Sequence, residues 1–281
     1  MEEPRTAAFS GMLDGKRALV IGGGGGGIGH AISGRLAAAG SAVAVADVDR
    51  GRAKEAAGEV EAAGVRGVAL VSDVSVRGGA EALVHQVAEE LGGLDVLMTV
   101  VGGQLAFVPA ALVHETADDD WDLMFDLNLR YVAEAVRAAL RVFLAQGSGG
   151  TIVSIGSIAG LAGSPGQAAY GAAKAGLANL ARSVAVEYGR DGIRMNVVAC
   201  GPIATPVAAA VQAGTTLDWI PLGARARPTR SPTRRSYWPR RSRRTSAARA
   251  SWWTAEPPQP GRFRLRAREP RPKLRIARDS A

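Results

Sequence analysis

The sequence predicts a doubly wound α/β fold, in which a parallel β-sheet carries helices on both faces. Short apolar runs of strand length alternate with helical patterns through residue 200. Six consecutive glycines, residues 22–27, follow the first of these apolar runs directly. Polar residues or glycines stand just after several strands, where a doubly wound sheet binds its ligand. This alternation favours strands that are parallel and buried.

The elements follow one another along the chain with recognisable boundaries. The strands are expected at residues 18–21, 42–47, 67–71, 95–101, 150–155 and 194–199. The helices are expected at residues 31–39, 52–63, 79–91, 118–145 and 167–188. Gly64 and Gly92 mark the ends of the second and third helices, and Asp118 complements the dipole at the start of the fourth.

The glycine turn after the first strand has the composition of an anion site. Backbone N–H groups and the positive end of a helix dipole both point at a ligand bound there. Glycine removes the Cβ that would keep the chain away from a pyrophosphate. Six glycines contain the pattern G-x-G-x-x-G trivially, so the pattern alone also allows a loop without a ligand. Asp47 ends the second strand, where a ribose-binding acid belongs, and we therefore predict a dinucleotide site.

Composition narrows the class of protein. The 281 residues suffice for one large α/β domain, and the single cysteine, Cys200, excludes an internal disulfide. No apolar run has the length of a membrane span, and residues 1–5 do not resemble a signal peptide. We expect a soluble cytoplasmic protein with no membrane partner and no metal site.

The net charge of +8 divides unevenly along the chain. Residues 224–281 contain 18 Lys and Arg against three Asp and Glu, a balance of +15. The preceding 223 residues contain 16 basic and 23 acidic residues, a balance of −7. Such an asymmetry is typical of an arm that binds nucleic acid or a membrane surface.

Four polar residues suggest proton chemistry. Tyr170 and Lys174 stand four apart in a predicted helix and so share one face. An ammonium near a phenol lowers the phenol pKa, which lets the tyrosine exchange protons near neutrality. Ser157, just past the fifth strand, can hold a substrate oxygen beside Tyr170, and Asn128 can hold a water that relays protons to Lys174. Each residue alone is also compatible with an ordinary helix or loop position.

The order of these motifs resembles the short-chain dehydrogenase/reductase family. Residues 164–176 are very similar to that family's active-site helix, and residues 192–198 and 201–206 resemble its sixth strand and following loop. The resemblance extends from about residue 13 to residue 223. It implies a Rossmann-type, three-layer αβα fold and NAD(P)-dependent interconversion of a small-molecule carbonyl and a secondary alcohol. It also implies a homotetramer or dimer.

The resemblance assigns a role to each site residue. It implies a Ser157–Tyr170–Lys174 triad assisted by Asn128. Asp47 would bind both ribose hydroxyls, which favours NAD over NADP because a 2′-phosphate would meet a carboxylate. Asp73 and Val74 would contact the adenine, and Ile203 and Thr205 the carboxamide. The implied cofactor-binding residues are Gly23, Gly27, Ile28, Gly29, Asp47, Asp73, Val74, Gly102, Tyr170, Lys174, Ile203 and Thr205.

The chain departs from the family pattern at three places. Gly22 stands where a threonine usually opens the glycine turn. Residues 99–102 read Thr-Val-Val-Gly in place of Asn-Asn-Ala-Gly. Cys200 replaces a proline, and we interpret it as a packed small residue rather than a reactive thiol. These departures leave the catalytic groups in place, and we expect a less rigid cofactor loop.

The resemblance stops abruptly after Gly223, and we hypothesise that the rest is translated out of frame. Trp252 and Trp253 have one codon each, and regrouping residues 252–257 one nucleotide earlier can encode Leu-Val-Asp-Gly-Gly-Ala, the family's final strand. We therefore divide the chain into a flexible leader (1–13), a catalytic domain (14–223) and a disordered basic tail (224–281). The last strand would then be missing from the sheet. As a consequence, we expect the chain to lose its oligomeric interface, to be less soluble and to have impaired activity.

Three functions remain open from the sequence. The first is an NAD-preferring oxidoreductase. The second is a damaged or non-catalytic relative that only binds dinucleotide. The third is a protein that binds nucleic acid through basic and aromatic residues of its tail, although we do not expect nucleic acid to be a functional partner.

Overall fold

The computed structural model describes residues 10–206 and residue 208. The expectations for the start of the leader, for most of the loop after Thr205 and for the tail with its missing strand lie outside the described residues. Residues 10–13, assigned to the leader, form a turn in which the Leu13 N–H donates to the Ala39 carbonyl oxygen (2.8 Å).

The elements follow the predicted order. The strands are β1 (Arg17–Ile21), β2 (Ala42–Asp47), β3 (Gly67–Val71), β4 (Val96–Thr99), β5 (Gly150–Ser157) and β6 (Ile193–Cys200). The helices are α1 (Ile28–Ala38), α2 (Arg50–Ala62), α3 (Gly79–Leu91), α4 (Asp118–Phe125), α5 (Tyr131–Gln146) and α6 (Ala168–Tyr188). β4 is shorter than expected, and Gly102 and Gly103, with positive φ (139° and 142°), lie in the loop that follows it.

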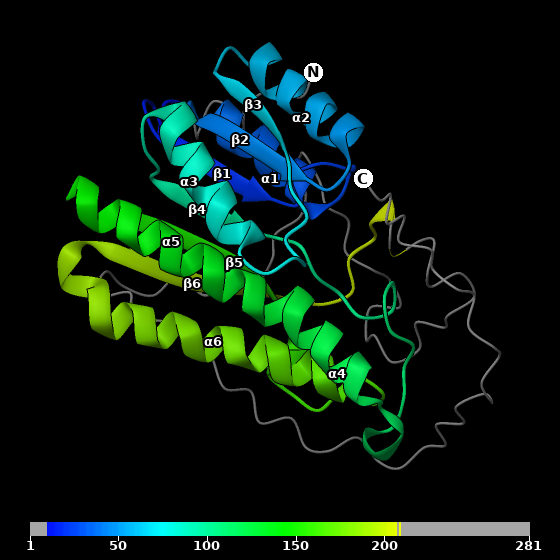
Figure 1. Cartoon of the computed structure of the whole chain (residues 1–281). Helices are drawn as coiled ribbons and strands as arrows, with labels where there is room; N and C mark the ends of the chain where they lie inside the picture. The colour runs from blue at the N-terminus through cyan, green and yellow to red at the C-terminus, as the bar shows by residue number, and fades with distance from the viewer. Residues whose placement is uncertain (1–9, 207, 209–281) are drawn as a thin grey trace, which may run out of the picture. The chain divides into compact units, whose positions relative to one another are not determined.

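The six strands form one parallel sheet in the order β3-β2-β1-β4-β5-β6 (Figure 1). The chain runs outward from β1 to β3 and then returns to place β4 beside β1. The predicted doubly wound fold is therefore confirmed. Its direction reverses between β1 and β4, and ligands of such sheets bind at the carboxyl ends of the strands at this point.

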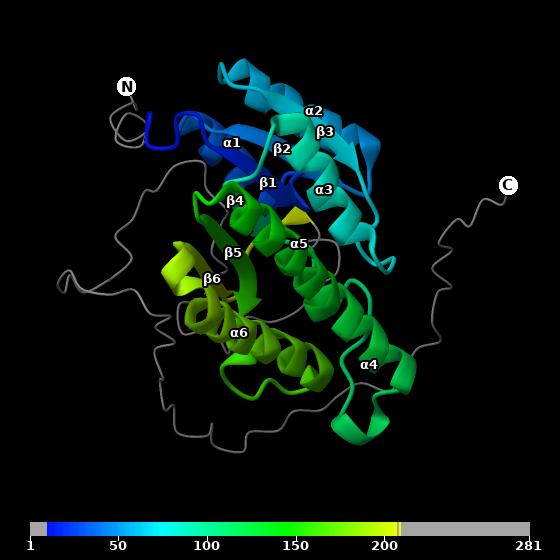
Figure 2. The same ribbon diagram turned by 60° about the vertical axis from the view of Figure 1, so that its left-hand side comes forward.

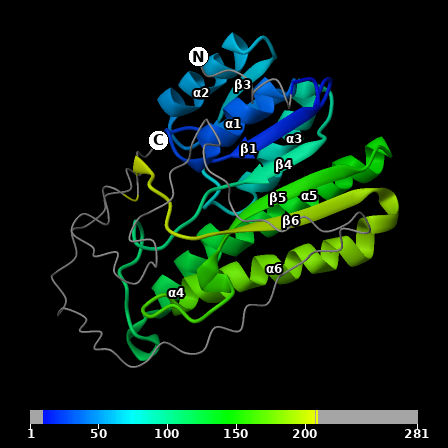
Figure 3. The ribbon, with the colours of Figure 1, turned by 180° about the vertical axis from the view of Figure 1, so that it is seen from behind.

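Helices α3, α5 and α6 pack on one face of the sheet, and α1 and α2 on the other (Figures 1 and 2). Alternate residues of β1 enter the two cores, Leu19 on the first face and Val20 on the second. Figure 3 looks onto the second face, where no helix of the described part of the chain covers β5 and β6. Val198 of β6 is 48 % exposed, although parallel strands are normally covered on both faces.

The helix expected at residues 118–145 is not a single regular α-helix. A π-helical turn, Asp126–Arg130, lies between α4 and α5. Periodicity could not show this turn, because one extra residue per turn hardly changes an apolar pattern. Turns of this kind are frequent at functional sites, and this one carries Asn128.

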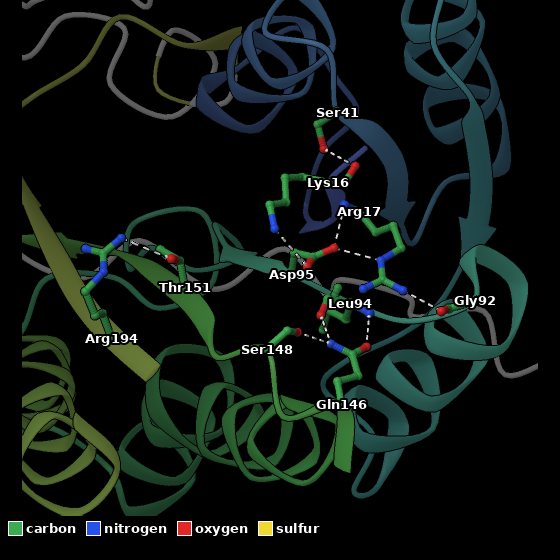
Figure 4. A network of polar contacts seen from close by, with 10 residues as sticks. All are labelled: Lys16, Arg17, Ser41, Gly92, Leu94, Asp95, Gln146, Ser148, Thr151 and Arg194. Atoms are coloured by element: carbon green, nitrogen blue, oxygen red, sulfur yellow. Dashed lines mark hydrogen bonds and ion pairs between the residues drawn. The ribbon is translucent and has the colours of Figure 1, made fainter. Parts of the chain in front are cut away.

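A polar network holds the amino ends of the central strands (Figure 4). The Asp95 carboxylate accepts from the Arg17 backbone N–H (3.0 Å) and from Arg17 Nε (2.7 Å), and Lys16 Nζ lies 3.6 Å away. The Gln146 side chain bonds to both the N–H (2.8 Å) and the carbonyl (2.7 Å) of Leu94. Because these groups lie at the opposite ends of the strands from the switch point, we interpret the network as structural.

We predict opposite effects for two glycines of α1. A Cβ on Gly29 would overlap the Gly22 carbonyl oxygen, whereas a Cβ on Gly34 meets nothing within 4 Å. Gly29→Ala should therefore lower the free energy of unfolding by about 1–3 kcal/mol. Gly34→Ala should raise it by about 0.5–1 kcal/mol, because alanine favours an open helical position. Urea unfolding of both variants tests this, and equal effects would contradict it.

Candidate functional site

The glycine turn lies at the carboxyl end of β1 and leads directly into α1. Gly25 and Gly26 have φ values of 75° and 68°, which favour glycine. Gly27 is the N-cap residue of α1, and no side chain caps the helix there. Ser33 Oγ donates to the Gly29 carbonyl oxygen (3.1 Å) one turn back. The turn therefore presents backbone N–H groups at a helix N-terminus, the arrangement that binds phosphate.

Two other segments meet the turn. A Cβ on Gly27 would lie 3.9 Å from Thr205 Cγ2, so the loop after β6 reaches the start of α1. On the other side, a Cβ on Gly24 would lie 2.9 Å from Asp47 Oδ2 at the end of β2. Ile203 is half-buried in the same loop as Thr205. The fold thus gathers the turn, the acid and the loop that the sequence predicted as cofactor contacts.

Asp47 has a partner that the sequence analysis missed. Its Oδ1 accepts from the Asp49 N–H (3.1 Å) and forms an ion pair with Arg52 Nη2 (3.2 Å). Asp49 in turn caps α2 by accepting from the Arg52 N–H (2.9 Å). The sequence could have indicated this ion pair, because Arg52 stands five residues after Asp47, at the start of the next helix.

Asp73 and Val74 follow β3 with different surroundings. The Asp73 carboxylate is exposed and accepts from the N–H (2.9 Å) and hydroxyl (2.6 Å) of Ser75. The Val74 side chain is 6 % exposed and belongs to the core beneath α3. An adenine contact by Val74 would therefore fall to its backbone.

Close packing brings Ser157 to the first turns of α6. A Cβ on Gly160 would lie 2.7 Å from the Lys174 carbonyl carbon, and one on Gly171 would lie 2.7 Å from the Ala159 carbonyl oxygen. The segment after β5 can approach the helix only because both positions are glycine. The Ser157 hydroxyl accepts from the Ala159 N–H (3.1 Å) and interacts with the Tyr170 hydroxyl, which it stabilises in the ionised form.

Lys174 is buried beside Tyr170. The lysine is 4 % exposed, and its Nζ lies 5.7 Å from the centroid of the Tyr170 ring. Nζ also donates to the Ile155 carbonyl oxygen (2.9 Å). Burial disfavours the charged amine and lowers the pKa of Lys174 to about 8. The site therefore contains an amine that can change its charge close to neutral pH.

The expected lowering of the Tyr170 pKa is wrong for the protein by itself. Burial raises the pKa of Tyr170 above its usual value, and the hydrogen bond with Ser157 only partly opposes this. The neighbouring Cys200 raises it further. The physical reason is that desolvation of the phenolate outweighs the polar contacts. A nicotinamide cation would act in the opposite direction when bound.

Asn128 holds the loop that follows β4. Its side chain is fully buried, with Oδ1 accepting from the Gly103 N–H (2.9 Å). Nδ2 donates to the carbonyl oxygens of Gly103 (3.1 Å) and Met124 (3.0 Å). A Cβ on Gly102 would meet both Asn128 Oδ1 (2.5 Å) and Lys174 Nζ (3.2 Å), so these two groups flank one backbone position. A proton relay from Asn128 to Lys174 remains a proposal.

Two further residues border the site. Cys200 pairs in register with Ser157 and is half-buried, and burial raises its pKa while Lys174 lowers it. Gln104 is 7 % exposed and its Nε2 donates to the Gly166 carbonyl oxygen (2.7 Å), which ties the loop after β4 to the turn before α6. No sequence signal pointed to Gln104. Cys200 could have been placed beside Ser157 from the expectation that β5 and β6 are neighbours in the sheet.

Within residues 10–206, no cluster of three or more His, Cys, Asp or Glu side chains could hold a metal ion. No helix among these residues is long and apolar enough to cross a membrane.

The fold and the site together define a dinucleotide-dependent oxidoreductase. A doubly wound sheet carries a glycine turn at its switch point, and Ser157, Tyr170 and Lys174 meet nearby. The family model described as short chain dehydrogenase matches residues 16–216. The chain therefore belongs to the short-chain dehydrogenase/reductase family.

Individual proteins support this membership. Cis-4-hydroxycyclohexanecarboxylate dehydrogenase of Sinomonas cyclohexanicum is 39 % identical over 216 residues, which cover 76 % of this chain and 85 % of that protein. A short chain dehydrogenase from Burkholderia cenocepacia in complex with NADP has a TM-score of 0.69 and 34 % identity, covering 77 % of this chain and 86 % of that one. Carveol dehydrogenase from Mycobacterium avium in complex with NAD has a TM-score of 0.67 and 29 % identity, covering 71 % and 75 %.

Burial of Lys174 predicts a pH-dependent cost in stability. Between pH 10.5 and about pH 8 the unfolded chain holds a proton on Lys174 that the folded chain releases, so stability rises with pH in this window. Below about pH 8, protonated Lys174 lowers the free energy of unfolding by the full amount, on the order of 3 kcal/mol. Lys174→Met should therefore raise the free energy of unfolding at pH 7 by roughly 1–2 kcal/mol, after loss of the bond to Ile155.

Chemical unfolding of both proteins from pH 7 to pH 10 measures this difference. The advantage of Lys174→Met should shrink as pH rises. Lys54→Met, at an exposed position of α2, is the matched control and should show no such trend. If the difference in the free energy of unfolding between Lys174→Met and the unmodified chain stays constant with pH, the buried amine is not its cause.

Proposed function

We propose that this chain is an NAD-preferring oxidoreductase that interconverts a carbonyl group and a secondary alcohol by hydride transfer. The observation that supports this proposal is the meeting of Ser157, Tyr170 and Lys174 beside the glycine turn. Family membership gives the general class of oxidoreductase, and these side chains support the proposed reaction. The protein would act as a cytoplasmic enzyme on a small molecule.

In this proposal the chain's own residues handle the proton, and the bound dinucleotide supplies or accepts the hydride. Tyr170 donates its phenolic proton to the carbonyl oxygen during reduction and takes the alcohol proton during oxidation. Ser157 donates a hydrogen bond to the same oxygen and holds it near Tyr170. Lys174, when protonated, stabilises the phenolate and binds the nicotinamide ribose. Asn128 holds a water that returns protons to Lys174.

The remaining predicted residues would hold the dinucleotide. The turn from Gly23 to Gly29 would bind the pyrophosphate through its N–H groups. Asp47 would accept from the adenosine ribose, which supports NAD as the preferred cofactor. Ile203 and Thr205 would contact the carboxamide.

The names of two similar proteins support a first choice of substrates. One dehydrogenase acts on cis-4-hydroxycyclohexanecarboxylate, and one structural neighbour is a carveol dehydrogenase. We therefore propose cyclic secondary alcohols, and the ketones derived from them, as the substrate class to assay first.

A second candidate is a relative that binds dinucleotide without turnover. The observation that favours it is the second face of β5 and β6, which no described helix covers. That face is partly exposed, as Val198 shows. This exposure would destabilise the pairing of β5 with β6, which holds Ser157 and Cys200 in register. Binding would survive because the glycine turn depends on β1, β2 and α1 instead.

We predict that Tyr170→Phe strongly lowers turnover but leaves dinucleotide binding intact. Without the hydroxyl no proton can be transferred, so kcat should fall by about 10²–10⁴-fold. The dissociation constant for NADH, followed by its fluorescence, should change little because the ring remains. Tyr188→Phe, at the end of α6, is the matched control and should retain full activity.

The two readouts separate the candidates. Turnover of the alcohol panel that Tyr170→Phe removes supports the oxidoreductase. NADH binding without turnover by the unmodified chain supports the second candidate. A Tyr170→Phe variant as active as the unmodified chain would sink the proposed catalytic role.

A further inference from the structure

Three segments of the chain border the groups that would carry the reaction. The loop after β4 does so at Gly102, where an added Cβ would lie 3.2 Å from Lys174 Nζ. Ser157 of β5 pairs in register with Cys200 of β6, so the segments that follow these two strands leave the sheet side by side. A substrate whose carbonyl oxygen lies between Ser157 and Tyr170 therefore has to lie among these three segments.

The three segments contain no lysine or arginine. Residues 102–125, which are the loop after β4 and α4, contain five Asp or Glu and no Lys or Arg. Residues 156–173 and 200–217 contain no charged residue at all. Lys174 directly follows the second of these ranges, and the proposed reaction already uses its charge. An anionic group on the substrate would therefore find no further cation in these segments.

The acidic residues of the first segment lie close to the catalytic tyrosine. Met124 of α4 packs with Ala169 of α6, and Tyr170 is packed against the same apolar cluster. The first turn of α4 carries three aspartates, residues 118–120. A carboxylate or phosphate on the substrate would thus lose hydrating water and face negative charge, and both effects disfavour its binding.

Apolar side chains are exposed in the same segments. Phe107 is 44 % exposed, and a Cβ on Gly103 would lie 3.9 Å from its Cε2. Asn128 bonds to both the N–H and the carbonyl oxygen of Gly103, which fixes the backbone beside this ring. Ile158, which is 43 % exposed, directly follows Ser157. Aromatic and aliphatic side chains at such a place favour a hydrocarbon group on the ligand.

We propose that the substrate is an uncharged, apolar ketone or alcohol, and that Phe107 contacts its hydrocarbon part. This rests on the proposed function, because it takes the carbonyl oxygen to be bound by Ser157 and Tyr170. Within the cyclic alcohols named above, it selects those that carry no carboxylate or phosphate. An apolar group gains by leaving water for the Phe107 ring, whereas a charged group leaves water without a partner.

Matched pairs of ketones test the substrate class. The two members of a pair share a carbon skeleton, and a methyl group in one replaces a carboxylate in the other. The pairs are 4-methylcyclohexanone with 4-oxocyclohexanecarboxylate, 4-methylacetophenone with 4-acetylbenzoate, and 2-pentanone with 4-oxopentanoate. The full-length chain is assayed at pH 7, where the carboxylates are ionised, at one fixed ionic strength and with the reduced dinucleotide that gives the faster turnover.

In each assay the dinucleotide gives a hydride to the carbonyl carbon and the oxygen takes a proton, so loss of the reduced dinucleotide measures turnover. We expect kcat/KM to be about 100-fold lower for the carboxylate than for the methyl ketone of a pair.

A charge introduced at position 107 tests the residue. Phe107→Lys should raise kcat/KM for the carboxylates and lower it for the methyl ketones, so that their ratio shifts by about tenfold or more. Phe107→Leu keeps an apolar side chain and should leave the ratio within about threefold. Leu144→Lys is the matched control, because Leu144 of α5 is 46 % exposed and the substitution adds the same charge. It should leave the ratio unchanged.

The other outcomes contradict the inference in distinguishable ways. Equal or higher kcat/KM for the carboxylates overturns the substrate class and leaves the proposed function intact. The same shift in Leu144→Lys as in Phe107→Lys, or no shift in either, overturns the role of Phe107. A chain that binds NADH but reduces none of the six ketones overturns the proposed function, and the inference with it.

Discussion

The approach of α1 to the carbonyl group of Gly22 is the contact on which the rest of the site depends. A Cβ on Gly29 would overlap the Gly22 carbonyl oxygen, so the start of α1 can approach the turn this closely only because residue 29 is glycine. Once they meet, the N-terminus of α1 points its N–H groups across the carboxyl ends of β1 and β4. Asp47 lies on one side of the turn and Thr205 on the other, because Asp47 ends β2 and Thr205 follows β6 in the same parallel sheet.

Two departures from the family pattern compensate for each other at this turn. Gly22, in place of the usual threonine, has a φ of 85°, and a Cβ there would lie 2.9 Å from Val101 Cγ2. Val101, in place of alanine, therefore fills the space that a side chain at position 22 would take. Beneath it, Thr99 Oγ1 bonds to Ser154 Oγ (2.8 Å) and ties β4 to β5 where the family uses asparagines. The exchange of residue types thus keeps the turn packed.

The fold buries the ionisable groups of the catalytic residues, although this burial is electrostatically unfavourable. Lys174 and Tyr170 are both buried, and burial disfavours the charged form of each. Glycines at positions 160 and 171 allow the backbone approach that buries them. The same burial places the lysine pKa near neutrality, so the cost in stability and the capacity for proton transfer have one cause.

The sequence by itself determined the order of strands and helices, the glycine turn and the Ser157, Tyr170 and Lys174 set, because these depend on local periodicity and spacing. It missed the π-helical turn at Asn128, whose pattern differs too little from a regular helix. Only the tertiary structure decided the direction of the Tyr170 pKa and placed Cys200 beside Ser157. It also placed Arg52 on Asp47. The reason is that burial and charge pairing depend on distances between segments, and these distances exist only once the sheet has formed.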